Sequence, residues 1–508
     1  MARPAMNEVD YAGPDYSDVQ GLLRFGYGRL IKASYALLRV KNAAAARAWL
    51  RTAPVSNAMM MDPPPSTALQ VAFTAPGLRA LGLPEPVIAG FSLAFRAGMA
   101  QESHARQLGD VESNAPEYWQ WGGPASEVHL VVMFFAHPDT FDAFVQGITG
   151  DTWGAAFSEV HWLKTENLDG IEPFGFADGI SQPQLDWEQQ RHPSHSEFDY
   201  SNVVALGEFL LGYRNEYGLF TDRPLLDPDA ASADLLPALD APEKKDLGRN
   251  GTYLVMRQLE QDVRTFWQFV HQQADGNAAD AQKLAAAMVG RTRAGDPLVP
   301  VQQQLIPGTG TAPERIRQNQ FTFDQDPAGA RCPFGAHVRR ANPRNADFPE
   351  RPANLLKKLL TMLGFGPQGF RDDLMSSVRF HRILRRGREY GCELKPEDAL
   401  APAPPDDPKR GLHFICLNAN ISRQFEFVQN AWMASTKFSG LTGENDPLLG
   451  NRQAIPGCPV TSDFTVQRDG ALRHRVTGLP QFVTVRGGAY FFLPSLRALR
   501  YIAGADDV

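Results

Sequence analysis

Two stretches of the chain begin in the same way, each with an apolar strand followed by a helix. In the first, residues 33–40 (ASYALLRV) precede an alanine-rich stretch at 42–51, and Asn42 is suited to cap that helix. In the second, residues 251–259 (GTYLVMRQL) precede a predicted helix at 261–273. This restart predicts two successive α+β units with largely antiparallel sheets, and it suggests an internal duplication, although no residue-level repeat is visible.

Further elements follow in each unit. The apolar pattern predicts strands at 68–74, 128–135, 158–163, 412–417, 482–485 and 489–493, with helices at 76–83 and 138–146. Residues 221–250 are rich in proline and in alternating charges, which is typical of a domain junction. At 508 residues the chain exceeds the size of a single core. We therefore expect an N-terminal domain at 1–235 and a C-terminal domain at 236–508.

Composition excludes several classes of protein. Hydrophobic residues make up 43% and charged residues 21%, as in ordinary globular chains. A net charge of −7 argues against a nucleic-acid-binding surface. The four cysteines form no CxxC pair, so neither a zinc site nor a disulfide framework is indicated. Because the apolar run at 130–136 is too short to span a bilayer and the start has no apolar leader, we expect a soluble, cytoplasmic protein that needs no membrane.

Two polar or helical insertions are predicted at 273–300 and 347–373. The second contains a basic amphipathic piece, ANLLKKLLTMLGFG, at 353–366. Such a piece either covers the core as a packed helix or binds a membrane surface or a partner.

The candidate chemistry centres on residues 331–344, RCPFGAHVRRANPR. His337 stands there between a turn-forming entry and a dense group of arginines, which suggests a metal-ligating imidazole beside an anion. A haem presents that combination, since its iron takes an imidazole and its two carboxylates attract guanidinium groups. The alternative is a capped turn that leads into a basic surface helix.

A second motif is GFADG at 175–179. Its two glycines permit a tight turn that can hold Asp178 in a cavity. A carboxylate above a haem iron can take a proton from peroxide and return it to the departing oxygen. In isolation, the motif is typical of an ordinary Asp-Gly turn.

A third segment, HRILRRGREYG at 381–391, supplies a cation. A guanidinium group in a fixed position can stabilise the negative charge that develops when an O–O bond breaks. We expect Arg385 to have this role, with Arg386 pointing the other way if the segment is extended. A basic surface strand is the alternative.

Together, Asp178, His337 and Arg385 are the parts of a haem peroxidase, and the segments that carry them resemble the dye-decolourising peroxidases. GFADG matches the GxxDG motif of that family, HVRRANPR its iron-ligand segment and ILRRGREYG its arginine segment. The resemblance extends over nearly the whole chain, through VQGLL (19–23), LGEFLLGYRNEYG (206–218), GRNGTYLVMRQLEQDV (248–263), NISRQFEFVQNAW (420–432) and RGGAYFFLPS (486–495).

The resemblance implies two ferredoxin-like domains, with the GFADG motif in the first and one haem b per chain held mainly by the second. It implies that His337 ligates the iron while Asp178 and Arg385 act on the opposite side. The spacing of 48 residues between His337 and Arg385 (385 minus 337), together with the total length, resembles a larger, insertion-bearing bacterial subclass.

Three more residues are candidates for the haem site. Asp446, in GENDPLLG, matches a segment where a carboxylate partner of the ligating histidine is found, and the alternative is an Asp-Pro surface turn. Arg339 and Arg344 are candidates to bind the haem carboxylates. The strand at 412–417 is expected to supply apolar lining, from a face that the sequence does not specify.

The predicted function is reduction of hydrogen peroxide, with one-electron oxidation of dyes, phenols or other bulky organic donors. Such donors do not fit a pocket sized for peroxide, so electrons are expected to enter through surface tyrosines or tryptophans. A homo-oligomer is possible. The alternatives are a haem-handling or deferrochelatase-like protein with incidental peroxidase activity, and a scaffold that has lost haem.

Overall fold

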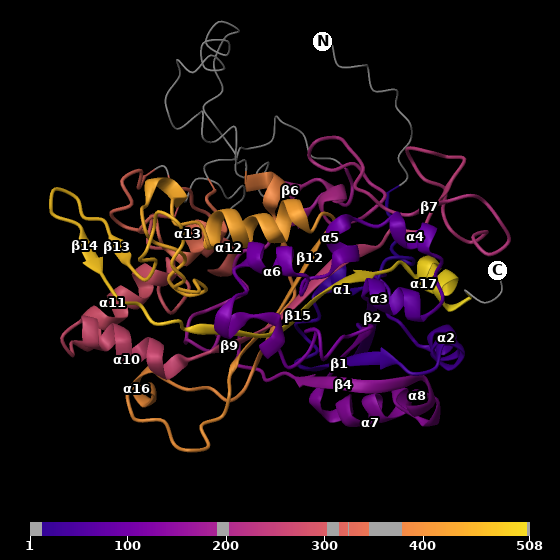
Figure 1. The fold of residues 1–508 in the computed structure, drawn as a ribbon, viewed down its shortest axis with the longest axis horizontal. Helices are drawn as coiled ribbons and strands as arrows, with labels where there is room; N and C mark the ends of the chain where they lie inside the picture. Colours follow the sequence, from indigo (N-terminus) through magenta and orange to yellow (C-terminus); the bar gives the residue numbers. More distant parts are fainter. Residues whose placement is uncertain (1–12, 190–202, 302–313, 324, 345–377, 505–508) are drawn as a thin grey trace, which may run out of the picture.

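The computed structural model describes residues 13–189, 203–301, 314–323, 325–344 and 378–504. Its centre is a nine-stranded sheet with helices around it, a mixed α+β architecture (Figure 1). The expected fold class is therefore confirmed. The amphipathic piece at 353–366 lies outside the described residues.

The N-terminal half of the sheet consists of four antiparallel strands. They are β1 (Lys32–Val40), β2 (Thr67–Phe73), β3 (Leu130–Ala136) and β4 (Phe157–Lys164), in the spatial order β2-β3-β1-β4. All four predicted strands of this half are present.

The C-terminal half repeats this order. Its strands are β9 (Thr252–Gln261), β10 (Leu384–Arg385), β12 (Gly411–Asn418) and β15 (Val483–Leu493), in the order β10-β12-β9-β15, and the short β11 (Arg388–Tyr390) also pairs with β12. Both halves thus place their four strands in the order second, third, first, fourth. The repeated order supports the internal duplication, while the domain boundary at 235 and 236 stays a prediction.

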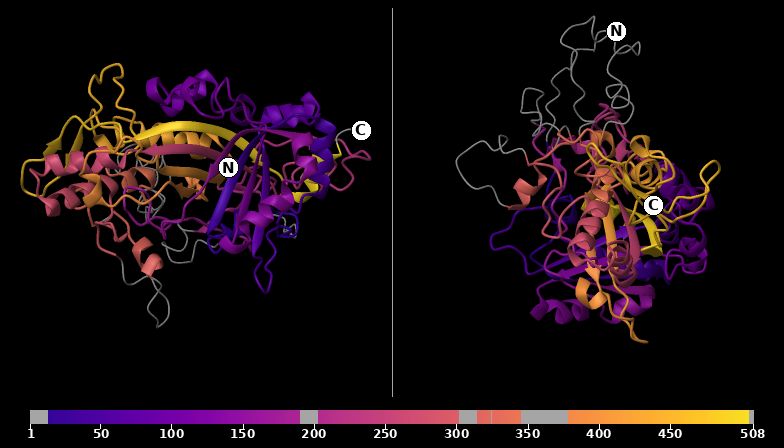
Figure 2. Two further views of the ribbon diagram at one scale, coloured as in Figure 1. Left: turned by 90° about the horizontal axis from the view of Figure 1, so that it is seen from below. Right: turned by 90° about the vertical axis from the view of Figure 1, so that its left-hand side faces the viewer.

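The two halves form one sheet through β15 and β2, where Phe492 pairs with Phe73. Figure 2 shows that the sheet runs continuously from one half to the other. Helices α10 (Val263–Gln273) and α11 (Ala278–Val289) lie at one end, and α2 (Ala43–Thr52), α7 (Pro138–Ile148) and α8 (Asp151–Ala156) lie at the other (Figures 1 and 2).

One strand prediction is corrected. Residues 482–485 and 489–493 belong to the single strand β15, which has a bulge between Val485 and Gly487. Trp121 packs so closely on Gly487, and the Met99 sulfur on Gly488, that neither glycine has room for a side chain. In the sequence, Gly487 and Gly488 look like the end of a strand. In the structure, their lack of a side chain lets β15 pass beneath Trp121 and Met99.

The helix caps follow the sequence. Asn42 accepts a hydrogen bond from the Ala45 amide at 2.9 Å at the start of α2, as predicted. Asp262 does the same for the Thr265 amide at the start of α10. The predicted helix at 76–83 is shorter in the structure, where α3 spans Ala75–Ala80.

The sheet is buried on both faces. Alternate residues of one strand belong to different apolar clusters, as Leu38 and Leu37 of β1 and Phe134 and Phe135 of β3 show. Each face therefore packs against its own layer of side chains.

The other elements are short. The helices are α1 (Leu22–Phe25), α4 (Glu85–Ala89), α5 (Leu93–Ala97), α6 (Glu102–Leu108), α12 (Glu314–Asn319), α13 (His337–Ala341), α16 (Pro396–Ala399) and α17 (Leu496–Ala503). Single turns are η1 (Glu112–Asn114), η2 (Pro116–Tyr118), η3 (Leu206–Glu208), η6 (Val378–His381) and η9 (Phe438–Gly440), and η7 (Ser422–Glu426) and η8 (Val428–Met433) are π-helical. Two-stranded pairs are formed by β5 (Gln184–Leu185) with β6 (Val203–Val204), β7 (Leu225–Leu226) with β8 (Lys245–Asp246), and β13 (Phe464–Val466) with β14 (His474–Val476).

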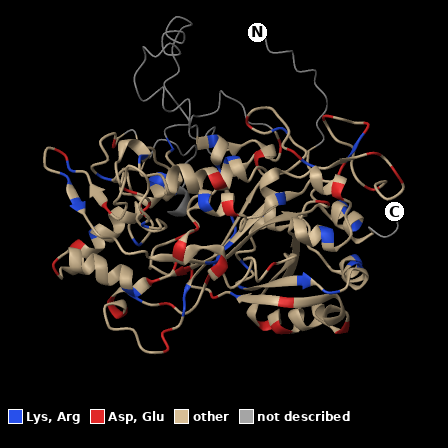
Figure 3. Ribbon diagram, in the orientation of Figure 1, with Lys and Arg blue, Asp and Glu red and all other residues tan. Residues whose placement is uncertain are grey.

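Charged residues of both signs are interspersed over the described elements (Figure 3). Within the part of the chain that the structure describes, no helix is both long and apolar enough to cross a bilayer.

Candidate active site

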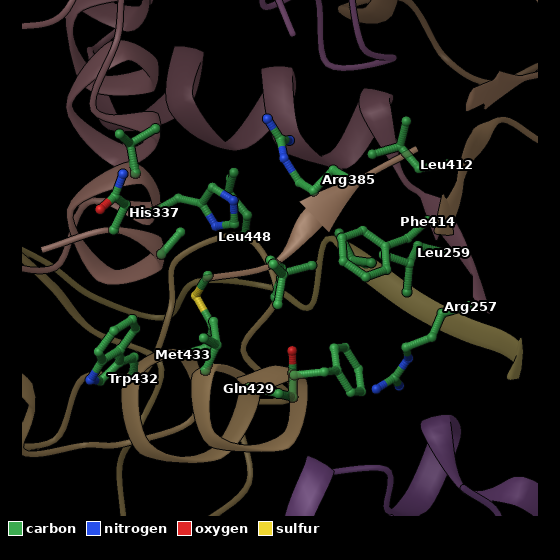
Figure 4. A pocket seen from close by; sticks show the side chains of 18 of the residues that line it. Arg257, Leu259, His337, Arg385, Leu412, Phe414, Gln429, Trp432, Met433 and Leu448 are labelled. Carbon is green, nitrogen blue, oxygen red and sulfur yellow. The ribbon is translucent and has the colours of Figure 1, made fainter. Parts of the chain in front are cut away.

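A cavity of about 300 Å³ lies against the C-terminal half of the sheet. Its walls come from β9, β12 and β15, from the loop at 172–183, from α13, and from the turns η6 to η8. This volume is at the lower end of the range for ligand pockets. Figure 4 shows His337 and Arg385 extending into it, with Gln429, Trp432 and Met433 of η8 facing them.

His337 is the first residue of α13 and lines this cavity. Its Nδ1 lies 3.1 Å from Oδ2 of Asp446, whose side chain is fully buried. The other carboxylate oxygen, Oδ1, accepts the amides of Leu448 and Leu449 at 2.9 and 2.8 Å. Because Asp446 is buried and paired, the alternative of an Asp-Pro surface turn is wrong.

His337 and Asp446 shift each other's pKa. Burial by itself would raise the pKa of Asp446, but His337 and Arg340 hold it below its usual value. Burial would lower the pKa of His337, but Asp446 raises it above the usual value. The carboxylate therefore keeps a proton on Nδ1, which leaves Nε2 as the nitrogen available to a metal ion.

Asp178 and Arg385 meet in the same cavity. Nη1 of Arg385 donates to Oδ1 of Asp178 at 2.9 Å, and about a third of each side chain is exposed, at 34% and 33%. Gly175 and Gly179, which flank Asp178 in the motif, have φ values of +94° and +72°. The turn therefore requires glycine at both positions, as the sequence suggested.

Arg385 controls the charge of Asp178. Burial alone would raise the pKa of Asp178, but the Arg385 guanidinium and the amide of Gly179 hold it below the usual value. Asp178 is thus an anion at neutral pH and can accept a proton.

The neighbouring Arg386 points the other way, as expected. Its Nε and Nη2 donate to the carbonyl oxygens of Leu22 and Leu23, both at 2.9 Å. Arg385 therefore points into the cavity, whereas Arg386 points away from it and binds backbone carbonyls.

Arg344 lines the cavity and is held in place by its neighbours. Its Nη2 donates to Oδ1 of Asn319 at 2.6 Å, and its guanidinium lies 3.8 Å from the centre of the Phe321 ring. Arg291 and Arg382 line the same cavity, and neither was singled out from the sequence. Several guanidinium groups thus border the apolar space.

The expectation for Arg339 is corrected. Arg339 is not among the residues that line the cavity, because its Nη1 is bound by Oδ2 of Asp326 at 3.0 Å and by the Cys332 carbonyl at 2.7 Å. Its guanidinium also lies over the rings of Phe323 and Phe334, at 4.3 and 4.6 Å. We therefore remove it from the set of candidate carboxylate-binding residues.

The apolar wall comes from one face of the sheet. Leu412 and Phe414 of β12 face the cavity with Leu259 of β9, whereas Ile415 and Leu417 pack in the opposite core (Figure 4). The face that the sequence left open is thus the one that carries Leu412 and Phe414.

Sequence reasoning missed several titratable residues in the cavity wall, among them His381 and Glu172. His381 stacks on Phe427 at 3.6 Å, and burial lowers its pKa to about 4, so it is uncharged. Glu172 lies six residues before Asp178, and burial raises its pKa to about 7 despite hydrogen bonds from Gln261 and from two amides. Glu172 is the first residue of the segment EPFGFADG, but its spacing from Asp178 does not identify it as a site residue.

The residues fit a haem. The cavity is lined mostly by apolar side chains, one imidazole presents Nε2 with a carboxylate behind it, and arginines stand at the border. Within the described residues, no group of three or more His, Cys, Asp or Glu side chains could hold a metal ion on its own. These features are the ones that an α+β haem protein would need: one histidine that could ligate the iron, and an acid–base pair in the same cavity.

Comparisons with known proteins agree with this class. A dye-decolorizing peroxidase of Mycetinis scorodonius is 28% identical over 99% of this chain and 90% of its own length. A multifunctional dye peroxidase of Amycolatopsis is 30% identical over 66% of this chain and 62% of its own length. No family model matches the chain.

Solved structures give the same result. A decolorizing peroxidase from Auricularia auricula-judae superposes with a TM-score of 0.69 at 25% identity, over 96% of this chain and 100% of the other. A peroxidase of this type from Anabaena has a TM-score of 0.67 at 23% identity and therefore bears on the fold alone. Over nearly its whole length the chain is thus similar, in sequence and in fold, to dye-decolorizing peroxidases.

Proposed function

We propose that this protein is a haem peroxidase that reduces hydrogen peroxide and oxidises dyes, phenols and other bulky organic donors by one electron at a time. The observation that carries the proposal is that the Asp178–Arg385 pair and the His337–Asp446 pair line one apolar cavity. The named activities of the relatives support it.

His337 would hold the iron through Nε2, and Arg344 would bind a carboxylate of the haem, which we take to be one haem b per chain. When bound, the haem would supply the redox-active iron through which peroxide oxidises the organic donor. Asp446 would keep the imidazole electron-rich by accepting a hydrogen bond from its Nδ1–H.

Asp178 and Arg385 would act on the peroxide itself. The ionised Asp178 would take a proton from one oxygen of the peroxide and return it to the departing oxygen. Arg385 donates hydrogen bonds to the negative charge that develops as the O–O bond breaks. Leu412 and Phe414 contribute apolar side chains to the wall of the same cavity.

Bulky donors would transfer electrons at the surface, and Tyr217 is the site that we favour. It is 54% exposed and stacks on Phe380 with ring centres 4.1 Å apart and an angle of 11°. The next residue, His381, packs at 5.4 Å from Trp432, and both line the cavity. The stacked pair at the surface is thus joined to the pair at the site through the peptide bond between Phe380 and His381.

The experiment that tests the function is an absorption spectrum of the purified protein followed by turnover of a dye with peroxide. A peroxidase shows a haem band and steady-state turnover. A haem-handling protein would show the band with little turnover, since it needs His337 but no acid–base pair, and a scaffold would stay colourless with added haemin.

Three finer assignments belong to the same proposal. The total length and the 48 residues from His337 to Arg385 support the larger, insertion-bearing bacterial subclass, while the relatives include fungal and bacterial proteins. We place the protein in the cytoplasm because its four cysteines lie far apart in the sequence and are expected to be reduced thiols, and a homo-oligomer stays a prediction.

A further inference from the structure

The loop that carries Asp178 is closed on itself around Glu172. The Glu172 amide donates to the Phe176 carbonyl at 2.8 Å, and the Gly175 amide donates to the Glu172 carbonyl at 2.7 Å. Asp178 is fastened in the same way, since its amide donates to the Gly170 carbonyl at 2.9 Å. Residues 170–178 therefore form one tight unit with Asp178 at its end.

The Glu172 carboxylate fills the inside of this unit. Its Oε2 accepts the Phe174 amide at 3.0 Å, and its Oε1 accepts the Phe176 amide at 3.0 Å. Nε2 of Gln261, at the end of β9, donates to Oε2 at 2.8 Å and ties the loop to the sheet. Without this carboxylate, two amides and one side chain would lose their acceptor, which is costly away from water.

We propose that Glu172 is a positioning residue, whose carboxylate fixes the loop through the Phe174 and Phe176 amides and so sets where Asp178 stands and how strongly it attracts a proton. The inference deepens the proposed function and rests on the role of Asp178 as proton acceptor. Glu172 itself is not required to touch peroxide.

The charges around Glu172 support the second half of this statement. Asp178 is an anion on the same loop, and the two negative charges raise one another's affinity for protons. Arg385 on β10 is bound to Asp178, and Nε of Arg293 donates to the Gly175 carbonyl at 3.2 Å, behind the loop. His337, on α13, faces the same cavity.

The charge of Glu172 changes in the physiological range. Burial raises its pKa to about 7, although Gln261 and the two amides act in the opposite direction. Above this pH the ionised Glu172 makes Asp178 a better proton acceptor, and below it the effect is lost. The rate of reaction with peroxide should therefore rise with pH through about 7.

The test is Glu172→Gln in the full, haem-loaded protein. The amide has the same size, but one of its two groups is a donor that faces a backbone N–H. We expect an unchanged haem band, a peroxide rate that falls about tenfold at pH 8, or about 1.4 kcal/mol, and loss of the rise through neutral pH.

A second readout does not depend on activity. Hydrogen exchange of the Phe174 and Phe176 amides, measured without peroxide, should accelerate by about tenfold or more in Glu172→Gln, as expected when a hydrogen bond to a charged group is lost. Glu444→Gln is the matched control, because this buried glutamate also accepts a backbone amide, that of Thr465 at 2.9 Å, and does not line the cavity. It should change neither the rate nor the exchange at 174 and 176.

If Glu172→Gln does not fold, Gln261→Met provides the test. It keeps Glu172 and removes a hydrogen bond that favours the ionised form, so the rise in rate should move to higher pH. If the wild type is active and these variants have the same pH profile and the same amide exchange as the wild type, the inference is wrong. A wild type that binds no haem or ignores peroxide would instead overturn the proposed function.

Discussion

Nδ1 of His337 lies 3.1 Å from Oδ2 of Asp446, a carboxylate with no exposed surface. A buried charge needs a partner, and this one has an imidazole and two amides. Because Nδ1 of His337 faces Asp446, Nε2 is the nitrogen that can bind a metal ion, and His337 lines the cavity.

Asp446→Asn should therefore weaken haem binding while the protein remains folded. Loss of a carboxylate behind a ligating histidine typically costs about 10- to 100-fold in affinity. Titration of the apoprotein with haemin measures the change. Asp262→Asn is a suitable control, because asparagine caps a helix as well as aspartate does and α10 lies outside the cavity wall. Equal affinity in Asp446→Asn and wild type would argue against the pair.

Asp178→Asn should leave haem bound but slow the reaction with peroxide on the order of 100- to 10,000-fold, the range for loss of a general acid–base group. Stopped-flow measurement of the change in the haem band gives the rate. Asp169→Asn provides the comparison, since Asp169 is an exposed residue shortly before the same loop and asparagine tolerates its φ of +54°. An undiminished rate in Asp178→Asn would mean that another group moves the proton.

Arg385→Leu should lower the peroxide rate by roughly 100- to 1,000-fold. It should also shift the pH profile, because Arg385 is the main influence that lowers the pKa of Asp178 against burial. With the cation removed, Asp178 becomes protonated at a higher pH, so activity on the acid side is lost sooner as pH falls. The observable is the pH at which the rate is halved.

Arg386→Leu separates the two arginines. Arg386 binds the carbonyls of Leu22 and Leu23 and does not line the cavity, so its loss should lower the Tm with little change in rate per bound haem. A large loss of rate in Arg386→Leu, with none in Arg385→Leu, would reassign the role.

Tyr217→Phe should slow oxidation of a bulky dye several-fold without changing the rate with peroxide, because phenylalanine keeps the stacking on Phe380 but is far harder to oxidise. Tyr118→Phe is the matched control, as Tyr118 is also exposed, at 63%, and does not line the cavity. If both variants oxidise the dye like wild type, electrons enter elsewhere.

Patterns in the sequence predicted the strands, helix starts and turns that depend on neighbouring residues. Short apolar runs predicted β1 to β4, and Asn42 marked the start of α2. Glycines beside Asp178 marked a turn that requires positive φ. These signals work because each depends on residues a few positions apart.

What was missed depends on residues distant in the chain. Arg339 and Arg340 follow His337 after a single valine. Only Asp326, together with the surrounding carbonyls, decides that Arg339 turns away from the cavity. β15 continues through Gly487 and Gly488 beneath Trp121 and Met99, which come from the other half of the chain. Glu172 matters through a closed loop that the letters EPFGFADG do not reveal.

The most direct test of the account is the spectrum of the haem-loaded wild type beside that of His337→Ala, by optical absorption and electron paramagnetic resonance. We expect one haem per chain with a nitrogen-ligated ferric iron in the wild type, and loss of that nitrogen signal in the variant. If His337→Ala keeps the same ligand signal and the same haem content, iron is held by another residue and the account is wrong.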